Sequence, residues 1–544
     1  MSRSDTRLRL RIGLFALLLV GALALVGCGS SSSSSSSSGD TSESGSSVSE
    51  GSTASEGTSN GSEDSGTPEA GGTMTLALNE EVTTLNPQRA ILPAEVMETS
   101  QINEPLWQEN LDGELVPWLI EKVETSKGER VYTLHLKKNV KFSNGQPMTS
   151  ADVLFTLEEA RKSEYWAELL SGITGVEAPN ASTIVITNKE PAAELPAVLS
   201  QWSFGIEPKN LAGESEKEWE THPIGTGPFA VVSFQRGVAL TLEKNKYYWQ
   251  TGMPYLDKVV IKTAPDANAR VAQLNSGELD VILQPPWSQV TAIESNSETE
   301  FGDFPKGFNK LLFLNTRKPV FQNMKAREAV NLALDREGMI NVAMGGKGEP
   351  SGAFVPPPIA YHDPSIEAPE QNVEKAKQLL AEAVKEGVNP TFKLSTPLED
   401  AFFVSATQVI QQNLEEVGFK VSIQKLDGSS LFEALETGKY DAAPGFIWTP
   451  VATPTEIFAF YNSFEAQFTG LPIDETTKLF NEALSQPDEA KREQLYFQLQ
   501  EIVAEDQAVV PIAYEPYSWA FRKNVVDFHV GNIGIPWLYT AGIE

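Results

Sequence analysis

Residues 223–249 read PIGTGPFAVVSFQRGVALTLEKNKYYW, and the rest of the chain can be organised around them. Gly225 and Gly227 give the backbone unusual freedom, including positive φ, just before an apolar run. Runs 229–235 and 238–244 predict two strands joined by a two-residue turn. The predicted buried face of the second strand carries Val238, Leu240 and Leu242. Because the stretch has no nucleophile, metal ligand or phosphate-binding loop, its residues alone predict a hairpin of the protein core.

The segments GTGPF (225–229) and LEKNKYYW (242–249) resemble the most recognisable block of the family 5 solute-binding proteins. These are the extracytoplasmic peptide-, nickel- and oligosaccharide-binding components of ABC importers. Three further segments resemble the same family in the same order along the chain. They are TTLNP followed by NEPLW (83–107), YTLHLKKNVKFSNGQPMTSADVLFTLE (132–158) and RKPVFQNMKAREAVNLALDRE (317–337). The resemblance covers about residues 72–540.

Composition limits what the chain can bind. With 544 residues it is long enough for two or three domains. Its formal net charge of −31 favours solubility and repels nucleic acid and anionic membranes, so no nucleic-acid partner is expected. Cys28 is the one cysteine in the sequence, so no disulfide within the chain is possible.

The first 28 residues have the three parts of an export signal. A basic segment with four arginines precedes the apolar run 12–26, which is shorter than a membrane span. Leu25-Val26-Gly27-Cys28 follows and resembles a bacterial lipoprotein box, which implies a diacylglycerol on the Cys28 thiol. The alternative is a cleaved signal with an incidental cysteine. Residues 29–71, with nine serines at 30–38, predict a disordered tether. The protein is therefore expected outside the cell membrane, held by its lipid.

The resemblance implies a two-lobed α/β fold of the periplasmic-binding-protein type (type II), with an extra inserted subdomain and a hinge between the lobes. The implied division is lobe I at 72–112, 223–312 and 510–544, the inserted subdomain at 113–222, and lobe II at 313–509. The chain would then cross between lobes near 312–315 and 510–512. A monomer that binds ligand between its lobes and docks on ABC permease subunits is expected. A surface sensor with the same fold is an alternative, and a secreted hydrolase is a further one.

Local patterns predict the elements that build these lobes. Strand–helix–strand units are expected at 259–283 and 391–423, and Gly277 and Gly418 end their helices. An amphipathic helix is expected where Ala326, Ala329, Val330, Ala333 and Leu334 recur at helical spacing. A helix over 96–106, short strands at 310–315 and 509–514, and an extended surface loop at 350–366 complete the expectations.

Enzyme chemistry is not expected. Four scattered histidines show no metal-ligand spacing, and no serine occupies a strand–turn–helix elbow. No nucleotide-binding loop is present, and no cofactor or metal is expected. Composition alone leaves a glycosidase with paired acids open.

Ten residues are candidates for the ligand site. They are Leu85, Asn86, Trp202, Phe204, Thr226, Gly227, Trp287, Asn315, Trp448 and Thr449. Trp448 is the strongest, because an indole face suits peptide, sugar or other planar groups.

In peptide-binding relatives, an aspartate just after this tryptophan pairs with the ligand's α-amino group. Here no aspartate occurs between Asp441 and Glu456. The sequence thus predicts a weakened preference for free peptide amino termini, and a blocked peptide or a non-peptide solute becomes a candidate ligand. The alternative is that Glu456, or an acid from elsewhere, substitutes.

Overall fold

The computed structural model describes residues 68–544 except 112, 164, 398–399, 449–452, 463–465 and 532–533. Its main feature is an eleven-stranded sheet built from segments throughout the chain. In spatial order the strands are β15 (Lys420–Leu426), β14 (Thr391–Pro397), β16 (Ala442–Ile447), β12 (Thr299–Leu314), β17 (Val509–Arg522), β11 (Val281–Leu283), β1 (Thr73–Leu78), β10 (Lys258–Thr263), β9 (Ala239–Lys244) and β8 (Phe229–Gln235). The short β13 (Glu349–Pro350) also pairs with β17.

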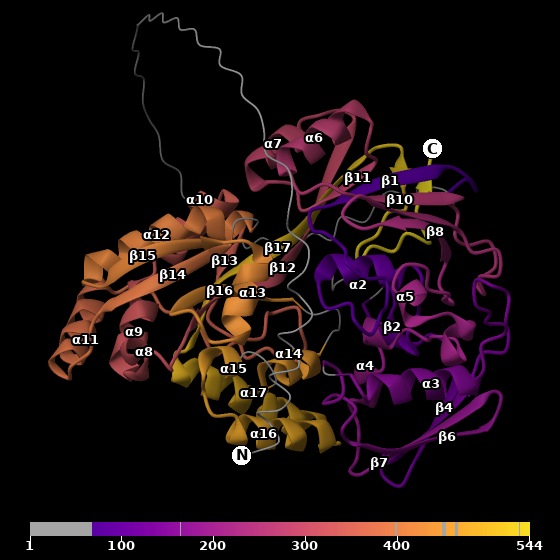
Figure 1. Cartoon of the computed structure of the whole chain (residues 1–544), viewed down its shortest axis with the longest axis horizontal. Coiled ribbons are helices and arrows are strands. Elements are labelled where there is room, and N and C mark those ends of the chain that lie inside the picture. The colour runs from indigo at the N-terminus through magenta and orange to yellow at the C-terminus, as the bar shows by residue number, and fades with distance from the viewer. Residues whose placement is uncertain are drawn as a thin grey trace, which may run out of the picture. The chain divides into compact units, whose positions relative to one another are not determined.

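The two long strands β12 and β17 connect the halves of this sheet (Figure 1). They run antiparallel, and their register shifts between Phe304 and Phe308. On one side of that shift β12 pairs with β16, and on the other side β17 pairs with β11. The expectation of short strands at 310–315 and 509–514 therefore underestimated both strands.

A separate four-stranded antiparallel sheet is formed by residues 120–188. Its order is β4 (Ile120–Ser126), β5 (Val131–Leu136), β7 (Thr183–Asn188) and β6 (Ile173–Asn180). Helix α3 (Ser150–Ala160) packs against β6 and β7 (Figure 1). The Thr149 and Asp152 side chains form the capping box that starts α3. Two further strand pairs are β2 (Trp107–Glu109) with β3 (Leu115–Pro117), and β18 (Val525–Val526) with β19 (Gly542–Ile543).

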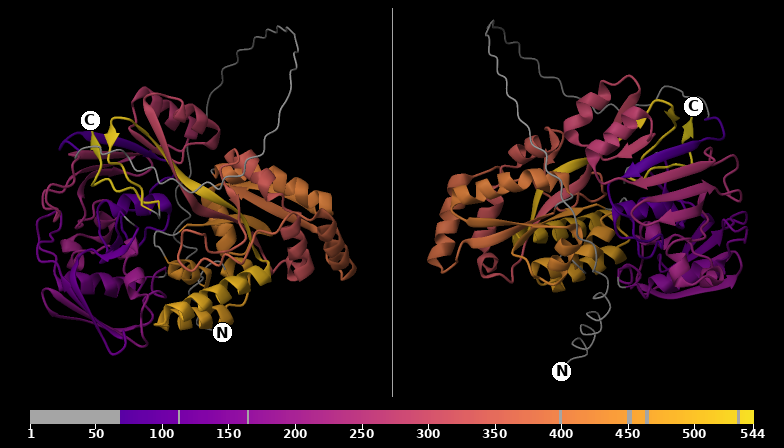
Figure 2. Two further views of the ribbon diagram at one scale, coloured as in Figure 1. Left: turned by 180° about the vertical axis from the view of Figure 1, so that it is seen from behind. Right: turned by 45° about the horizontal axis from the view of Figure 1, so that its top comes forward.

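The remaining helices cover these sheets. They are α2 (Pro93–Ser100), α4 (Leu195–Val198), α5 (Glu216–Trp219), α6 (Ala267–Ser276), α7 (Val290–Glu294), α8 (Pro319–Gln322), α9 (Met324–Ala333), α10 (Arg336–Met344), α11 (Val373–Lys385), α12 (Ala401–Val417), α13 (Gly428–Glu436), α14 (Thr455–Phe460), α15 (Ala466–Thr469), α16 (Asp474–Ser485) and α17 (Glu489–Asp506). Short 3₁₀ turns occur at η1 (Trp202–Phe204), η2 (Lys209–Gly213) and η3 (Trp287–Gln289). Helix α12 packs on β14 and β15, and α16 packs on α17 (Figure 2).

Both predicted strand–helix–strand units are confirmed. β10 and β11 flank β1 in parallel with α6 between them in sequence, and β14 and β15 are parallel with α12 between them. Gly277 and Gly418 adopt the left-handed conformation that ends these helices. The five apolar residues predicted for the helix at 326–334 are all completely buried.

The hairpin at 223–249 is confirmed as β8 and β9, but its glycines serve a different purpose from the predicted one. Neither Gly225 nor Gly227 has positive φ. A Cβ at Gly225 would lie 1.9 Å from the Ile102 carbonyl oxygen, and one at Gly227 would lie 2.6 Å from it. Close backbone approach is therefore what requires glycine here. Val238 was wrongly assigned to the buried face: it lies in the turn and is 56% exposed.

Two other expectations are wrong. The predicted helix at 96–106 is α2, which begins at Pro93 and ends at Ser100. It stops there because the Gln101 and Ile102 carbonyls accept hydrogen bonds from the Phe229 and Gly227 N–H groups. The proline-rich segment 350–366 is not purely a surface loop, since Ala353, Phe354 and Val355 are buried in the core.

Candidate functional site

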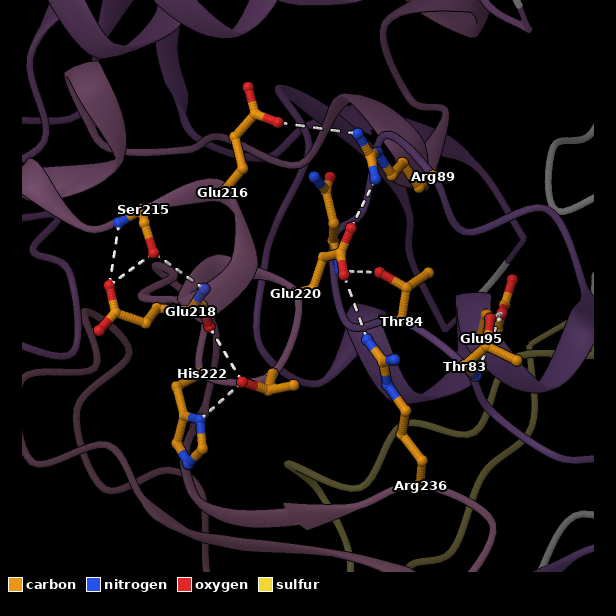
Figure 3. Close-up of polar contacts among 12 residues, drawn as sticks. Thr83, Thr84, Arg89, Glu95, Ser215, Glu216, Glu218, Glu220, His222 and Arg236 are labelled. Atoms are coloured by element: carbon orange, nitrogen blue, oxygen red, sulfur yellow. Dashed lines mark hydrogen bonds and ion pairs between the residues drawn. The ribbon is translucent and has the colours of Figure 1, made fainter. Parts of the chain in front are cut away.

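The loop after β1 is held in place by Glu220 and by the turn between β8 and β9. The Leu85 N–H donates to the Glu220 carbonyl, and Asn86 accepts from the Gln88 N–H, so Asn86 shapes its own turn. The Glu220 carboxylate pairs with Arg89 and with Arg236 of the β8–β9 turn (Figure 3). Leu85 is completely buried. The hairpin therefore anchors the loop that was expected to contact ligand.

The end of the segment 223–249 is held by hydrogen bonds to a buried carboxylate. Glu104 accepts hydrogen bonds from the Trp118 indole at 2.8 Å, the Tyr248 hydroxyl at 3.0 Å and the Trp249 indole at 3.1 Å. Burial raises the pKa of Glu104 to about 7, against the lowering effect of these donors. Thr226 lies beside this carboxylate and is completely buried. The structure thus gives the segments NEPLW and KYYW a packing role.

A charged cluster lies on the paired strands β12 and β17. Lys310 forms ion pairs with Asp400 at 2.9 Å and with Glu515 at 3.0 Å. The two carboxylates outweigh burial and raise the pKa of Lys310, so it stays charged. Trp287 donates its indole N–H to Glu515 at 3.0 Å. Phe446 in β16, 40% exposed, has its ring centroid 5.5 Å from the Lys310 ammonium.

Several buried polar side-chain atoms of the described residues have no hydrogen-bond partner, and two of them belong to Trp448 and to Glu80, which lies within reach of the Lys310 charge. One is the indole nitrogen of Trp448, and the other is Oε2 of Glu80. Trp448 follows β16 and packs against Ile535 and Trp202. Burial raises the pKa of Glu80, while the Ala94 N–H and the charge of Lys310 oppose that shift. Buried polar groups in proteins are mostly hydrogen-bonded, so an unpartnered one calls for an explanation, and a bound ligand is one such explanation.

The structure separates the predicted site residues into two groups. Trp202 and Trp448 pack in one apolar cluster. Trp287 joins the charged cluster through its hydrogen bond to Glu515. The others are occupied elsewhere: Phe204 packs edge-on against Trp166, the Gly227 N–H donates to Ile102, and Asn315 donates to the Tyr440 carbonyl. Thr449 and Cys28 lie outside the described residues.

Four charged residues of this region were missed: Glu80, Lys310, Asp400 and Glu515. They come from four distant parts of the sequence, so no spacing joins them. One signal was available for Glu80, because it lies two residues beyond the apolar segment that forms β1, where open α/β sheets present groups to ligands.

A second network joins α17 to the region of the four-stranded sheet. Glu194, just before α4, forms a buried ion pair with Arg492 of α17 at 2.9 Å. The Thr455 hydroxyl donates to the same carboxylate, and the Tyr361 hydroxyl accepts from Arg492. Tyr361 stacks on Tyr496 with ring centroids 5.2 Å apart. The contacts of Glu194 connect segments that are more than 260 residues apart.

Within the described residues, no cluster of three histidine, cysteine or acidic side chains has a geometry that would hold a metal ion. In that same part of the chain, no helix combines the length and apolar character needed to cross a bilayer.

Comparison with known proteins identifies the family. The model of the bacterial extracellular solute-binding proteins, family 5, matches residues 114–468, well over half of the chain. The chain belongs to this family. As a family 5 solute-binding protein it has the two-lobed α/β fold of periplasmic binding proteins, and its relatives are solute-binding components of ABC transporters rather than enzymes.

Relatives of this family 5 protein differ in what they bind. The glutathione-binding protein GsiB of Shigella flexneri is 26% identical over 486 residues, which cover 85% of this chain and 92% of GsiB. The Helicobacter pylori protein DppA, solved with the peptide STSA, is 25% identical with a TM-score of 0.79, covering 88% of this chain and 99% of DppA. AgaA from A. tumefaciens R10, solved with agropinic acid, is 25% identical with a TM-score of 0.78, covering 87% and 99%.

Proposed function

We propose that this chain is the lipid-anchored binding protein of an ABC importer. It captures a peptide or peptide-like solute between two lobes outside the membrane and delivers it to the permease. The observation that carries the proposal is that Trp448 Nε1 and Glu80 Oε2, in distant segments of a family 5 protein, are among the buried atoms with no hydrogen-bond partner. The Helicobacter pylori relative with bound peptide supports a peptide ligand. A non-peptide solute, as in AgaA, is the alternative.

The lobes follow the division proposed from the sequence, with 113–222 inserted into lobe I. The hinge is the β12–β17 ribbon, which is continuous with both halves of the large sheet. Its register shift between Phe304 and Phe308 is a place where backbone angles can change without loss of the flanking pairs. Ligand held between the lobes stabilises the closed form, and the closed form is what the permease recognises.

Trp448→Ala is expected to weaken peptide binding by about 30-fold, because truncating a tryptophan that contacts the ligand costs about 2 kcal/mol or more. Trp448→Phe keeps an apolar ring but loses the indole N–H, so its effect should be smaller. Calorimetry with a mixed tetrapeptide library measures both. A folded Trp448→Ala protein with unchanged affinity would remove Trp448 from the site. If the wild-type protein binds no peptide, mass spectrometry of the copurifying solute decides for the non-peptide alternative.

The lipid anchor predicts a change of location. Cys28→Ala removes the thiol that would carry diacylglycerol, so the protein should leave the membrane fraction or remain unprocessed. Ser30→Ala, in the adjoining serine run, is the matched control and should stay membrane-bound. Fractionation of cells followed by immunoblotting checks both. A processed Cys28→Ala protein that remains with the membrane contradicts lipidation.

A further inference from the structure

We propose that Glu80 is the residue that recognises a positively charged nitrogen on the solute, so that the ligand class is an amine-bearing molecule such as a peptide with a free amino terminus. This inference rests on the proposed function and specifies the chemistry of its site. It favours the alternative that an acid from elsewhere replaces the aspartate absent after Trp448.

Glu80 lies close to the charged cluster on β12 and β17. It lies two residues beyond β1, and its carboxylate accepts from the Ala94 N–H at the start of α2. It is close enough to Lys310 and Asp400 for their charges to act on it. The charge of Glu80 acts on the hydroxyl of Tyr517. Gly534 lies against both Tyr517 and the indole nitrogen of Trp448. Glu80 and Trp448 therefore border the same small region.

The neighbouring acids are already engaged. Asp400 accepts from the Phe403 N–H through Oδ1 and pairs with Lys310 through Oδ2. Glu515 accepts from the Trp287 indole through Oε1 and pairs with Lys310 through Oε2. Glu80 is left with Oε2 buried and unpartnered. Of the three carboxylates around Lys310, Glu80 is the one that retains an oxygen for a ligand.

Charge balance also favours a cationic ligand. Asp400 and Glu515 pair with Lys310, and Glu80 and Glu95 are further acids of this region, so carboxyl groups outnumber the Lys310 ammonium; an uncompensated buried charge is costly. An incoming ammonium group supplies the missing positive charge and donates a hydrogen bond to the free oxygen of Glu80. The sequence after Trp448, TPVATPT at 449–455, contains no acid that does the same. Glu456, in the first turn of α14, is buried and has interactions of its own.

The test compares two tetrapeptide libraries that differ in one group. One has free amino termini and the other is N-acetylated. Calorimetry on the wild-type protein is expected to show at least tenfold tighter binding of the free-amine library. Glu80→Gln should lose about 30-fold in affinity for that library, because it removes one partner of a buried charge pair, and should bind the acetylated library unchanged. Glu81→Gln, at the exposed neighbouring position, is the matched control and should behave as wild type.

Proton exchange provides a second readout. The groups acting on Glu80 are Lys310, Asp400 and Glu95 together with the Ala94 N–H, and burial outweighs them to raise its pKa. Binding of an amine ionises any protonated Glu80 and releases a proton. Titrations at a series of pH values in two buffers of different ionisation enthalpy should detect this release, and Glu80→Gln should abolish it.

The outcomes separate the two proposals. Equal binding of both libraries overturns the role of Glu80 while peptide capture stands. Loss of both libraries to the same extent in Glu80→Gln also overturns it, since the residue would then serve the fold. If the wild-type protein binds neither library, peptide capture fails. The solute that copurifies then tests Glu80 directly: a molecule with no basic nitrogen overturns the inference, and an amine supports it.

Discussion

Replacing Glu194 with glutamine should lower ligand affinity by about 100-fold or more, although residue 194 lies outside the proposed ligand site. The Glu194–Arg492 pair joins the proposed inserted subdomain to the proposed lobe II, and both side chains are buried. Breaking one side of a buried ion pair costs about 3–5 kcal/mol, because the remaining charge stays buried without its partner. If the lobes separate on opening, this cost falls on the closed form alone. More of the binding free energy must then be used to close the lobes, so the measured affinity falls.

The measurement is calorimetric affinity for the peptide library, combined with thermal unfolding of the ligand-free protein. Glu194→Gln and Arg492→Gln should each weaken binding, and the double variant should weaken it by less than the sum of the two. The exposed pair Arg130–Glu190, in the same subdomain, is the control: Glu190→Gln should change little. An equal loss of affinity in Glu190→Gln and Glu194→Gln would show that the Glu194–Arg492 pair does not specifically stabilise the closed form. So would a large drop in the unfolding temperature of the ligand-free protein, which would assign the pair to the fold.

The elements with strong local signals were predictable. Helix α12 has the predicted bounds because Gly418 ends it in a left-handed conformation, and α9 was found from apolar spacing alone. Strand β12 was underestimated because its first half, TEFGDFPKG, carries two glycines and a proline that read as strand breakers. Pairing with β17 holds this segment extended, and the partner lies about 200 residues away. Local propensity carries no information about such a partner.

The candidate site could be predicted only in part, again because local sequence carries no information about distant partners. Trp448 and Trp287 follow strand ends, which is a local signal that sequence reasoning can use. Lys310 lies inside an apolar strand and was overlooked as a charge. Its partners Asp400 and Glu515 are joined to it by the register of β12 against β16 and β17 and by the start of α12. Only folding brings these charges together, so the missing acid after Trp448 was visible in the sequence while its proposed replacement, Glu80, was not.

Folding stability should fall as pH rises from about 4.5 to about 7, because of two buried carboxylates. Glu104 and Glu207 each have a pKa raised from 4.5 to about 7, and burial is the main cause for both. Between these values the unfolded chain has lost protons that the folded chain keeps. Rising pH therefore favours the unfolded state. Below pH 4.5 both states are protonated and the effect vanishes. Above pH 7 each group costs about 3 kcal/mol, from a shift of about two and a half units.

Glu207→Gln isolates one of these contributions. The Glu207 carboxylate accepts from the Trp219 indole and from the Gln88 amide, both at 2.6 Å. A glutamine keeps an acceptor for the Trp219 indole and cannot ionise, although the Gln88 amide can accept from it only by giving up its hydrogen bond to the Thr156 carbonyl. The variant should therefore lose part of the pH dependence and gain stability at pH 8 relative to pH 5. Denaturant unfolding at both pH values measures this change, with the exposed Glu121→Gln on β4 as control. An unchanged pH dependence in Glu207→Gln would show that Glu207 is ionised in the folded protein. Its two donors would then outweigh the cost of burial.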